Sequence, residues 1–344
     1  MQSRTDGQGA AHLRQIVFGM RASQALFVAA KLGIADHLAR APMTGAELAA
    51  AVTHADADAL TRVMRALCAL GVFAESGSGA FSLNETGKLL RSDVAGSYRA
   101  AVLLLAGDVR WRCWSDLLGT VRAGGGGAER ALGVSLFDFY AANPEESEIH
   151  DQAMRGISSA QVAAVLGAMD FSSAGLMVDV GGGTGELLAA ILAANPALQG
   201  VLFDLPHVVA HAGSVRDARH VGDRMQLVGG SFFDTVPAGG DTYLMKTVIH
   251  DWDDARATTI LRNCRNAMTP ASKLLLVERE LPEPGQAGRA AEAFLLDLEM
   301  LVMTPGGRER TRSEFASLLD GAGFNLARIV PTGAPVSIIE AFPV

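Results

Sequence analysis

The spacing of apolar residues divides the chain into two regions that meet near residue 175. Before this point apolar residues recur at helical intervals, as in residues 12–39, which include Ile16, Leu26 and Leu38. After it, helical stretches separate several short apolar runs, at residues 176–180, 199–204, 225–230, 242–249, 273–278, 326–332 and 336–342. Strands that alternate with helices predict an α/β fold whose mostly parallel sheet is covered on both faces.

The first region also shows where its helices begin and end. Thr44, followed three residues later by Glu47, forms a capping box that begins a short helix. A second helix begins near residue 57 and stops at Gly71, and a hairpin is predicted over residues 72–90. Helices followed by a two-stranded wing are the order of a winged helix.

Winged helices often bind DNA, but the charge balance of this region does not favour that function. Residues 22–100 hold seven Lys or Arg and seven Asp or Glu, whereas a DNA-binding module needs a basic face. The apolar helix surface predicts dimerisation instead. Residues 98–170 are predicted to be helical, with a flexible glycine-rich loop over residues 123–130.

These patterns predict three parts. They are a winged-helix-like dimerisation domain (residues 1–105), a helical linker (106–170) and an α/β domain (171–344).

The bulk composition predicts a folded protein that binds neither nucleic acid nor membrane. Of the 344 residues, 49% are hydrophobic and 19% charged, which is enough for a large core. The net charge of −8 argues against binding to nucleic-acid phosphates or to an anionic membrane surface. The three cysteines are widely spaced, and neither a transmembrane stretch nor a signal-peptide pattern is present, so we predict a cytoplasmic protein.

A glycine-rich loop follows the first predicted strand of the α/β domain. Residues 179–185 read DVGGGTG and precede a helix, an arrangement that lets the backbone approach a ligand closely. Nineteen residues after Gly185 the second strand ends in Asp204, whose carboxylate can accept hydrogen bonds from both ribose hydroxyls. We therefore predict a nucleoside ligand, although a tight turn without function is the structural alternative. The DxGxGxG spacing disfavours an NAD-dependent oxidoreductase.

Six motifs in a fixed order make the chain resemble a known family. They are DVGGGTG (179–185), FDLPHVV (203–209), GGSFFD (229–234), LMKTVIHDWDD (244–254), LLLVERELPE (274–283) and GGRERTRSEFASLLDGAGF (306–324). The chain resembles the S-adenosylmethionine-dependent O-methyltransferases of the caffeic acid and isoflavone type, and especially their bacterial relatives that methylate aromatic natural products.

The resemblance covers nearly the whole chain and implies both fold and activity. It implies that residues 171–344 form a Rossmann-like class I methyltransferase domain, which binds S-adenosylmethionine and carries out catalysis, and that the linker (106–170) contributes to the substrate pocket. It also implies that the winged-helix-like dimerisation domain forms a homodimer. The implied reaction is methyl transfer from S-adenosylmethionine, without a metal, to the hydroxyl of a polyketide- or phenazine-like aromatic molecule. Such chemistry belongs to the biosynthesis of antibiotics and other natural products.

The resemblance also implies a set of cofactor-binding residues, namely Gly181, Gly183, Asp204, Ser231, Phe232, Lys246 and Ser158. Asp204 would hold the ribose, and Phe232 would cover the adenine. The family usually has GDxF where this chain has Gly230-Ser231-Phe232, so an uncharged serine stands where an aspartate receives the adenine amino group. Lys246 is expected on the same strand face as His250, four residues later.

His250 is the candidate catalytic base. It follows the fourth predicted strand, and in open α/β sheets ligands bind beyond the carboxyl ends of the strands. A neutral imidazole, with its ordinary pKa of about 6.5, can take the proton of a phenol as the methyl group is transferred. By the resemblance, Glu278 and Glu309 flank this histidine and orient it, although Glu309 also fits a solvated loop charge. Asp253 is expected to cap the next helix.

Four residues stand where the family lines its acceptor pocket, namely Met154, Met300, Met303 and Thr304. Thioethers lie well against aromatic rings, but packing of the helix that ends at Met303 explains the methionines equally well.

Three other functions stay open beside methyl transfer. They are a diverged family chemistry such as hydroxylation or decarboxylation, an NAD-dependent oxidoreductase and a DNA-binding regulator.

Overall fold

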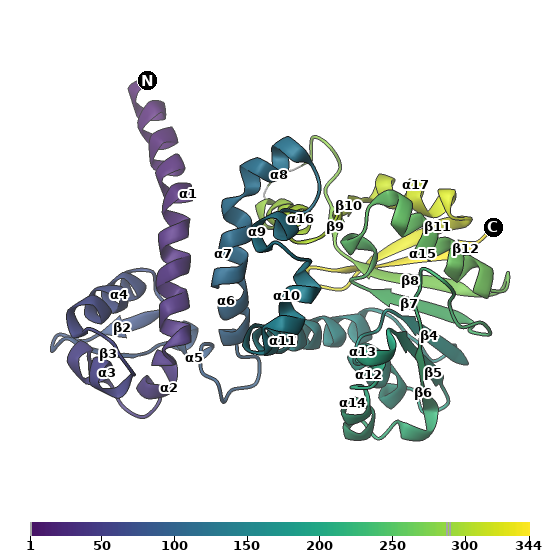
Figure 1. The fold of residues 1–344 in the computed structure, drawn as a ribbon, viewed down its shortest axis with the longest axis horizontal. Helices are drawn as coiled ribbons and strands as arrows, with labels where there is room; N and C mark the ends of the chain where they lie inside the picture. The colour runs from purple at the N-terminus through teal and green to yellow at the C-terminus, as the bar shows by residue number, and fades with distance from the viewer. Residues whose placement is uncertain (1, 287, 289) are drawn as a thin grey trace. The chain divides into compact units, whose positions relative to one another are not determined.

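The computed structural model describes residues 2–286, 288 and 290–344 of the chain (Figure 1). These residues form two compact units. The first comprises the described residues up to 112 and residues 137–157, and the second comprises residues 113–136 and the described residues from 158 on. Helices α7 (Asp108–Ser115) and α11 (Pro144–Ala168) each contribute residues to both units, and the first residue of α10 (Leu136–Ala142) belongs to the second unit.

The first unit is mainly helical with one small sheet. Its remaining elements are α1 (Gln2–Lys31), α2 (Ile34–Leu38), β1 (Met43–Thr44), α3 (Gly45–Ala51), α4 (Ala57–Ala69), β2 (Phe73–Glu75), β3 (Ala80–Leu83), α5 (Glu85–Lys88), α6 (Arg99–Leu105) and α10 (Leu136–Ala142). The sheet is antiparallel in the order β1-β3-β2, so the predicted wing is present with an additional short strand that the sequence pattern did not reveal.

Local sequence signals explain where these helices begin and end. The capping box is confirmed, because Thr44 accepts from the backbone of Glu47 and Glu47 accepts from the backbone of Thr44. Gly71, after α4, has φ +76°, a conformation that glycine adopts without strain. The predicted hairpin is too long, because Asn84 caps α5 through the N–H of Gly87 and ends the wing strand.

The predicted glycine-rich loop over residues 123–130 is shorter than expected. Helix α8 (Leu117–Ala123) ends at residue 123, the first residue of the predicted loop. The next helix, α9 (Gly127–Leu132), begins four residues later. The glycines allow close packing there, because a Cβ atom on Gly126 would lie 2.4 Å from the carbonyl oxygen of Thr304. The segment is therefore a tight connection between helices.

The second unit is built on a seven-stranded sheet in the order β11-β12-β8-β7-β4-β5-β6. The sheet strands are β4 (Leu176–Val180), β5 (Gln199–Asp204), β6 (Met225–Gly229), β7 (Thr242–Lys246), β8 (Lys273–Glu278), β11 (Phe324–Pro331) and β12 (Ser337–Pro343). The first five run parallel, whereas β12 pairs antiparallel with both β8 and β11. The mostly parallel sheet confirms the predicted α/β fold.

Helices and short segments complete the second unit, which also contains α8 and α9. The others are α12 (Glu186–Ala194), α13 (Pro206–Val209), α14 (Gly213–Ala218), α15 (Asp254–Ala267), α16 (Ala291–Met303), α17 (Arg312–Gly321), the 3-10 turns η1 (Gly222–Arg224) and η2 (Ile249–Asp251), and the paired short strands β9 (Glu280–Leu281) and β10 (Arg310–Thr311).

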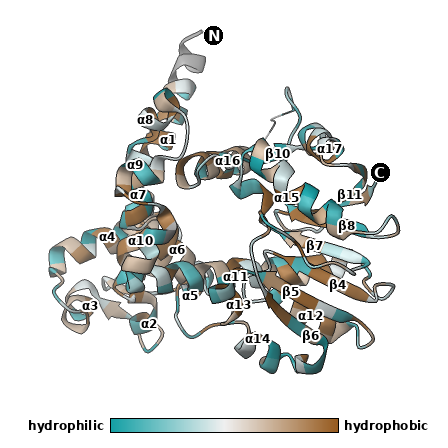
Figure 2. Ribbon diagram, turned by 45° about the vertical axis from the view of Figure 1, so that its right-hand side comes forward, coloured by the Kyte–Doolittle hydropathy of each residue, from teal (hydrophilic) through white to brown (hydrophobic). Residues whose placement is uncertain are grey.

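Two hydrophobic clusters pack on the sheet. One contains residues of α15 and α17, and the other contains residues of α12 and the last turns of α11. Strands β4 and β5 and helix α12 are coloured as hydrophobic in Figure 2, as expected for elements buried in a covered sheet.

The chain adds strands first on one side of β4 and then on the other side of it. From β4 the chain proceeds outward through β5 and β6, and then returns to place β7 on the other side of β4. Such a switch point leaves a crevice at the carboxyl ends of the two central strands. The loop after β4 begins at Gly181, and the loop after β7 leads to His250. The topology thus brings the two main predicted site segments to one edge of the sheet.

The strand before His250 is shorter than predicted. It ends at Lys246, and Thr247 has φ +53°, an uncommon conformation for a β-branched residue. The chain then turns through η2, so Lys246 and His250 do not lie on one strand face, and that prediction is wrong. The turn directs the histidine segment towards the segments that carry its two predicted acids.

Candidate active site

Close packing fixes the glycine-rich loop after β4. Gly181 has φ +70°, and its N–H donates to the carbonyl of Phe203 at 2.8 Å. A Cβ atom at Gly181 would lie 2.8 Å from Val248 Cγ2 and 3.4 Å from Phe232 Cε1. Gly183 has φ +61° and no heavy atom near its missing Cβ. The loop is therefore packed tightly behind Gly181 and open in front of Gly183, as a cradle for a ligand requires.

Asp204 ends β5 and holds the glycine-rich loop through its carboxylate. One carboxylate oxygen accepts the N–H of Gly183 at 2.8 Å, and the other accepts the N–H of Leu205 at 2.7 Å. Each oxygen has a further lone pair, so the half-buried carboxylate can still accept hydroxyl groups.

Asp179, the acid that begins the motif, was not among the predicted site residues. Its side chain is buried, and Oδ1 has no hydrogen-bond partner. Burial raises the pKa of Asp179 to about 7, with Lys246 opposing this change and Asp204 reinforcing it. Its place as the leading acid of the glycine motif was the sequence signal that could have identified it.

Lys246, at the end of β7, is held by two weak contacts. Its Nζ lies 3.4 Å from Gln161 Oε1 and 3.4 Å from the hydroxyl of Thr247. Burial lowers the pKa of Lys246, while Asp179 and Glu278 partly offset this effect. Ser158 lies three residues before Gln161 in α11, on the same helix face. This places Ser158 on the side of α11 that meets Lys246.

Ser231 and Phe232 follow β6. The Ser231 hydroxyl accepts the N–H of Phe233 at 3.2 Å, which stabilises the local turn. Phe232 packs edge-on against Phe233 and Trp252, with ring centroids 5.0 and 6.2 Å apart. Phe232 also lies against Gly181, as the packing around that glycine shows. The aromatic side chain is thus adjacent to the glycine-rich loop.

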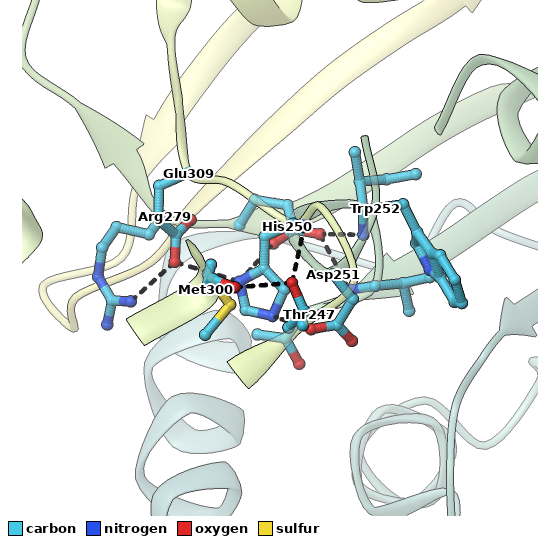
Figure 3. A network of polar contacts seen from close by, with 12 residues as sticks. Thr247, His250, Asp251, Trp252, Arg279, Met300 and Glu309 are labelled. Atoms are coloured by element: carbon cyan, nitrogen blue, oxygen red, sulfur yellow. Dashed lines mark hydrogen bonds and ion pairs between the residues drawn. The ribbon is translucent and has the colours of Figure 1, made fainter. Parts of the chain in front are cut away.

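The structure brings His250, Glu278 and Glu309 together (Figure 3). The His250 Nδ1 atom lies 3.2 Å from Glu309 Oε1 and 3.7 Å from Glu278 Oε2. Both carboxylates are buried, and Oε2 of each has no hydrogen-bond partner. Because both acids face Nδ1, Nε2 is the ring nitrogen that is left for a substrate. The nearest acid to Nε2 is Asp251, at 3.6 Å.

These acids change the charge state expected for the histidine. Burial alone lowers the pKa of His250, but Glu278, the hydrogen bond to Glu309 and Asp251 outweigh it and raise the pKa to about 9. A pKa of about 9 contradicts the sequence-based expectation of an imidazole that is neutral near pH 7. Burial also raises the pKa of Glu278.

Backbone contacts hold the His250 segment from two sides. Glu278 Oε1 accepts the N–H groups of Val248 and Ile249 at 3.0 and 2.8 Å. The N–H of Arg308 donates to the carbonyl of His250 at 2.8 Å. Arg310, almost completely buried, donates to the carbonyls of residues 249 and 252. The segment that carries Glu309 thus also fixes the backbone of His250.

A glycine permits this close approach. A Cβ atom at Gly307 would lie 2.4 Å from the carbonyl oxygen of His250 and 2.3 Å from Thr304 Oγ1. The predicted capping role of Asp253 is also present, because its carboxylate accepts the N–H of Arg256 and begins α15. His250 is therefore not needed as a cap.

Arg279, which follows Glu278, was not predicted from the sequence. Its Nη1 atom donates to Glu309 Oε1 at 3.1 Å, the same oxygen that faces His250. Within the described residues, His250, Glu278 and Glu309 are the group whose ring nitrogen and carboxylate oxygens approach within 4.8 Å, a spacing that would also suit a divalent ion. Here the guanidinium supplies positive charge at the shared oxygen.

The predicted acceptor residues fall into different environments. Met154 belongs to the first unit and is 37% exposed. Met303 is buried in a small cluster with Cys113, Ala128 and Val302, which favours the packing interpretation for this residue. Met300, one turn earlier in α16, is drawn in the close-up around His250 (Figure 3).

Thr304 ends α16 and uses its hydroxyl locally. The hydroxyl donates to the carbonyl of Met300 at 2.8 Å and accepts the N–H of Gly307 at 2.7 Å. Its proton is therefore engaged in holding the turn that leads to Glu309, and only an acceptor position is left for a substrate.

The chain matches two known domain families. Residues 114–325 match the O-methyltransferase domain, and residues 14–93 match the O-methyltransferase dimerisation domain. The first match covers more than half of the chain. The chain belongs to the O-methyltransferase family. This membership confirms the predicted fold class, the assignment as an enzyme and the family resemblance.

Relatives at substantial identity span the whole chain. The phenazine O-methyltransferase PhzM of Lysobacter antibioticus is 43% identical, and the alignment covers 96% of each chain. The structure of the mitomycin 7-O-methyltransferase MmcR is 35% identical, covers 99% of this chain and 100% of that one, and has a TM-score of 0.91.

A third relative carries ligands. The O-methyltransferase NcsB1 from neocarzinostatin biosynthesis was solved with S-adenosylmethionine and 2-hydroxy-5-methyl naphthoic acid. It is 33% identical, covers 94% of this chain and 96% of that one, and has a TM-score of 0.79. The family membership makes S-adenosylmethionine the methyl donor, which confirms the predicted cofactor.

Proposed function

We propose that this enzyme methylates a hydroxyl group on an aromatic ring, with His250 Nε2 as the general base. The observation that supports this role is the contact of Nδ1 with Glu309 at 3.2 Å, which makes Nε2 of the neutral imidazole the nitrogen that accepts a proton. Bound S-adenosylmethionine supplies a methyl group on a positively charged sulfur, and transfer is an in-line displacement. The glycine-rich loop, Asp204, Ser158, Ser231, Phe232 and Lys246 would bind the donor.

The acids around His250 fit the charge that develops during the reaction. When the acceptor oxygen bonds to the methyl carbon, its proton passes to Nε2 and the imidazole becomes positively charged. Glu278 and Glu309 are buried beside Nδ1 and stabilise this cation. Their orientation is fixed before the reaction by backbone N–H groups and by Arg279. General-base help of this kind typically accelerates a reaction by roughly 10²–10⁴-fold.

The raised pKa of His250 predicts a steep pH dependence. With a pKa of about 9, only about one imidazole in a hundred is unprotonated at pH 7. We therefore expect kcat/KM to rise about tenfold per pH unit and to level near pH 9, before a phenolic acceptor with a pKa of about 10 ionises. The measurement is kcat/KM against pH for a simple phenolic acceptor.

Glu309→Gln provides the matched control for this profile. Removing one negative charge lowers the pKa of His250, so the rising limb should move to lower pH. A wild-type profile that is flat between about pH 6 and 9 would rule out the proposed base.

Removal of metal ions should leave activity unchanged. Arg279 donates to the carboxylate oxygen beside His250, and the proposed base needs no bound metal hydroxide. We expect EDTA-treated enzyme to keep its full rate, and added Mg²⁺ or Zn²⁺ not to increase it. An activity that disappears with EDTA and returns with one of these ions would contradict the proposal.

We further propose that the acceptor is a flat aromatic molecule of the kind named for the relatives, such as a hydroxylated phenazine or naphthoic acid. The most direct test is mass spectrometry of reactions with S-adenosylmethionine and a panel of hydroxylated polycyclic aromatics. A mass gain of one methyl group supports the proposal. Gain of oxygen or loss of carbon dioxide would indicate the diverged hydroxylase or decarboxylase chemistry.

The working form is proposed to be a homodimer. The match to a dimerisation domain supports this, as do the exposed apolar side chains of α1, namely Leu13, Ile16, Val17, Phe18 and Met20.

None of the described helices is long and apolar enough to cross a membrane. A reducing, cytoplasmic location remains our prediction, supported by three cysteines that form no disulfide among the described residues.

A further inference from the structure

Arg279 occupies a defined position behind the proposed base. Its Nη1 lies 3.1 Å from Glu309 Oε1, and His250 Nδ1 lies 3.2 Å from the same atom. Figure 3 shows the carboxylate of Glu309 between the guanidinium and the imidazole. The Arg279 side chain is 18% exposed, whereas that of Glu309 is 0% exposed. A largely buried cation thus contacts a fully buried acid, which in turn contacts the histidine.

The charges around His250 come from several elements. Glu278 is contributed by the end of β8, Glu309 by the segment before β10, and Asp251 by the residue next to His250. Lys246, at the end of β7, interacts electrostatically with Glu278. Asp297 of α16 accepts the backbone N–H of Glu309 at 2.8 Å.

This charge set needs a counterion. Three carboxylates face the imidazole, and all of them favour its protonated form. A base that holds its proton too strongly cannot return to its reactive form after turnover. Arg279 is the cation that bonds directly to one of these carboxylates, and it therefore reduces the negative charge that Glu309 presents to Nδ1.

We propose that Arg279 is a positioning residue that shares Glu309 with His250, so that the carboxylate stays aimed at Nδ1 while the imidazole can release the proton it takes. This role rests on the proposed function of His250 as the base. After transfer, the proton moves from Nε2 to solvent, and the bond between Arg279 and Glu309 keeps the acid in place while the imidazole is neutral.

The test compares Arg279→Met with Arg279→Lys. Two-dimensional NMR of the imidazole nitrogens, with the His250 signal assigned from a His250→Gln variant, reports the protonation of His250 without any catalysis. In Arg279→Met the midpoint should rise by roughly 0.5 to 1 pH unit, less than the 1–3 units typical of a directly contacting charge. Arg279→Lys should stay close to wild type.

Kinetics give an independent readout. At about pH 7, kcat/KM of Arg279→Met should fall roughly 3- to 10-fold, in proportion to the midpoint shift, and the deficit should narrow towards pH 9. In a Glu309→Gln background, Arg279→Met should cause little further change, because Arg279 acts through that carboxylate. Arg328→Met removes a similar pair with Glu340 on β11 and β12 and should change neither readout.

Two outcomes would overturn the inference. An NMR midpoint that stays the same or falls in Arg279→Met would show that the guanidinium does not restrain the proton affinity of His250. A loss of activity by one constant factor at every pH would show a purely structural role. If the midpoint rises as expected but a His250→Asn enzyme stays fully active, the proposed base is wrong, whereas the electrostatic effect of Arg279 stands.

Discussion

Replacing His250 by asparagine is expected to lower kcat about 10²–10⁴-fold while the affinity for S-adenosylhomocysteine changes by less than about threefold. The reason is geometric. His250 faces Glu278 and Glu309 through Nδ1, whereas the predicted cofactor contacts come from the glycine-rich loop and Asp204. The rate is measured under saturating donor and acceptor, and the affinity by calorimetry.

His220→Asn is a suitable control for this substitution. His220 also lies in the second unit, but it is exposed and has φ +55°, a conformation that asparagine tolerates. This variant should keep wild-type kcat and affinity. If His250→Asn also stayed within a fewfold of the wild-type rate, methyl transfer would depend on positioning alone and the base mechanism would fail.

Strand periodicity and glycine spacing allowed much of the second unit to be predicted. The apolar runs at residues 176–180, 199–204 and 273–278 coincide with β4, β5 and β8, because buried parallel strands are apolar on both faces. The strand predicted over residues 242–249 was too long, because apolar residues continue in the sequence beyond the end of β7 at Lys246. Val248 and Ile249 are buried although they lie beyond the strand, at the start of η2, where Glu278 accepts their N–H groups.

The missed site residues share a physical reason. Arg279 and Arg310 act through contacts between segments that are far apart in the sequence, and arginine in a loop usually suggests a solvated charge. Arg310 is instead among the most deeply buried side chains, and it binds the carbonyls around His250. The charge state of His250 was missed because the resemblance gave Glu278 and Glu309 only an orienting role, and the sequence does not show how far their charges outweigh burial of the imidazole.

Replacing Asp204 by asparagine should weaken the binding of S-adenosylhomocysteine roughly 10- to 100-fold, because a hydrogen bond to a charged group contributes about 1.5–3 kcal/mol. The proposed ribose contact uses the lone pairs that the N–H groups of Gly183 and Leu205 leave free. Asparagine retains one acceptor oxygen but presents an NH₂ group in place of the other. One ribose hydroxyl, or one of the loop N–H groups, then loses its acceptor.

The matched control is Asp223→Asn, an exposed acid in η1 that precedes β6 and therefore lies at the opposite end of the strands. Calorimetry should give wild-type affinity for this variant, and thermal melting should show that both variants are folded. NAD⁺ should not raise the melting temperature of the wild-type enzyme, whereas S-adenosylhomocysteine should. Unchanged S-adenosylhomocysteine affinity in Asp204→Asn would remove the ribose contact from the site. The glycine-rich loop would then have to bind the nucleoside through its backbone alone.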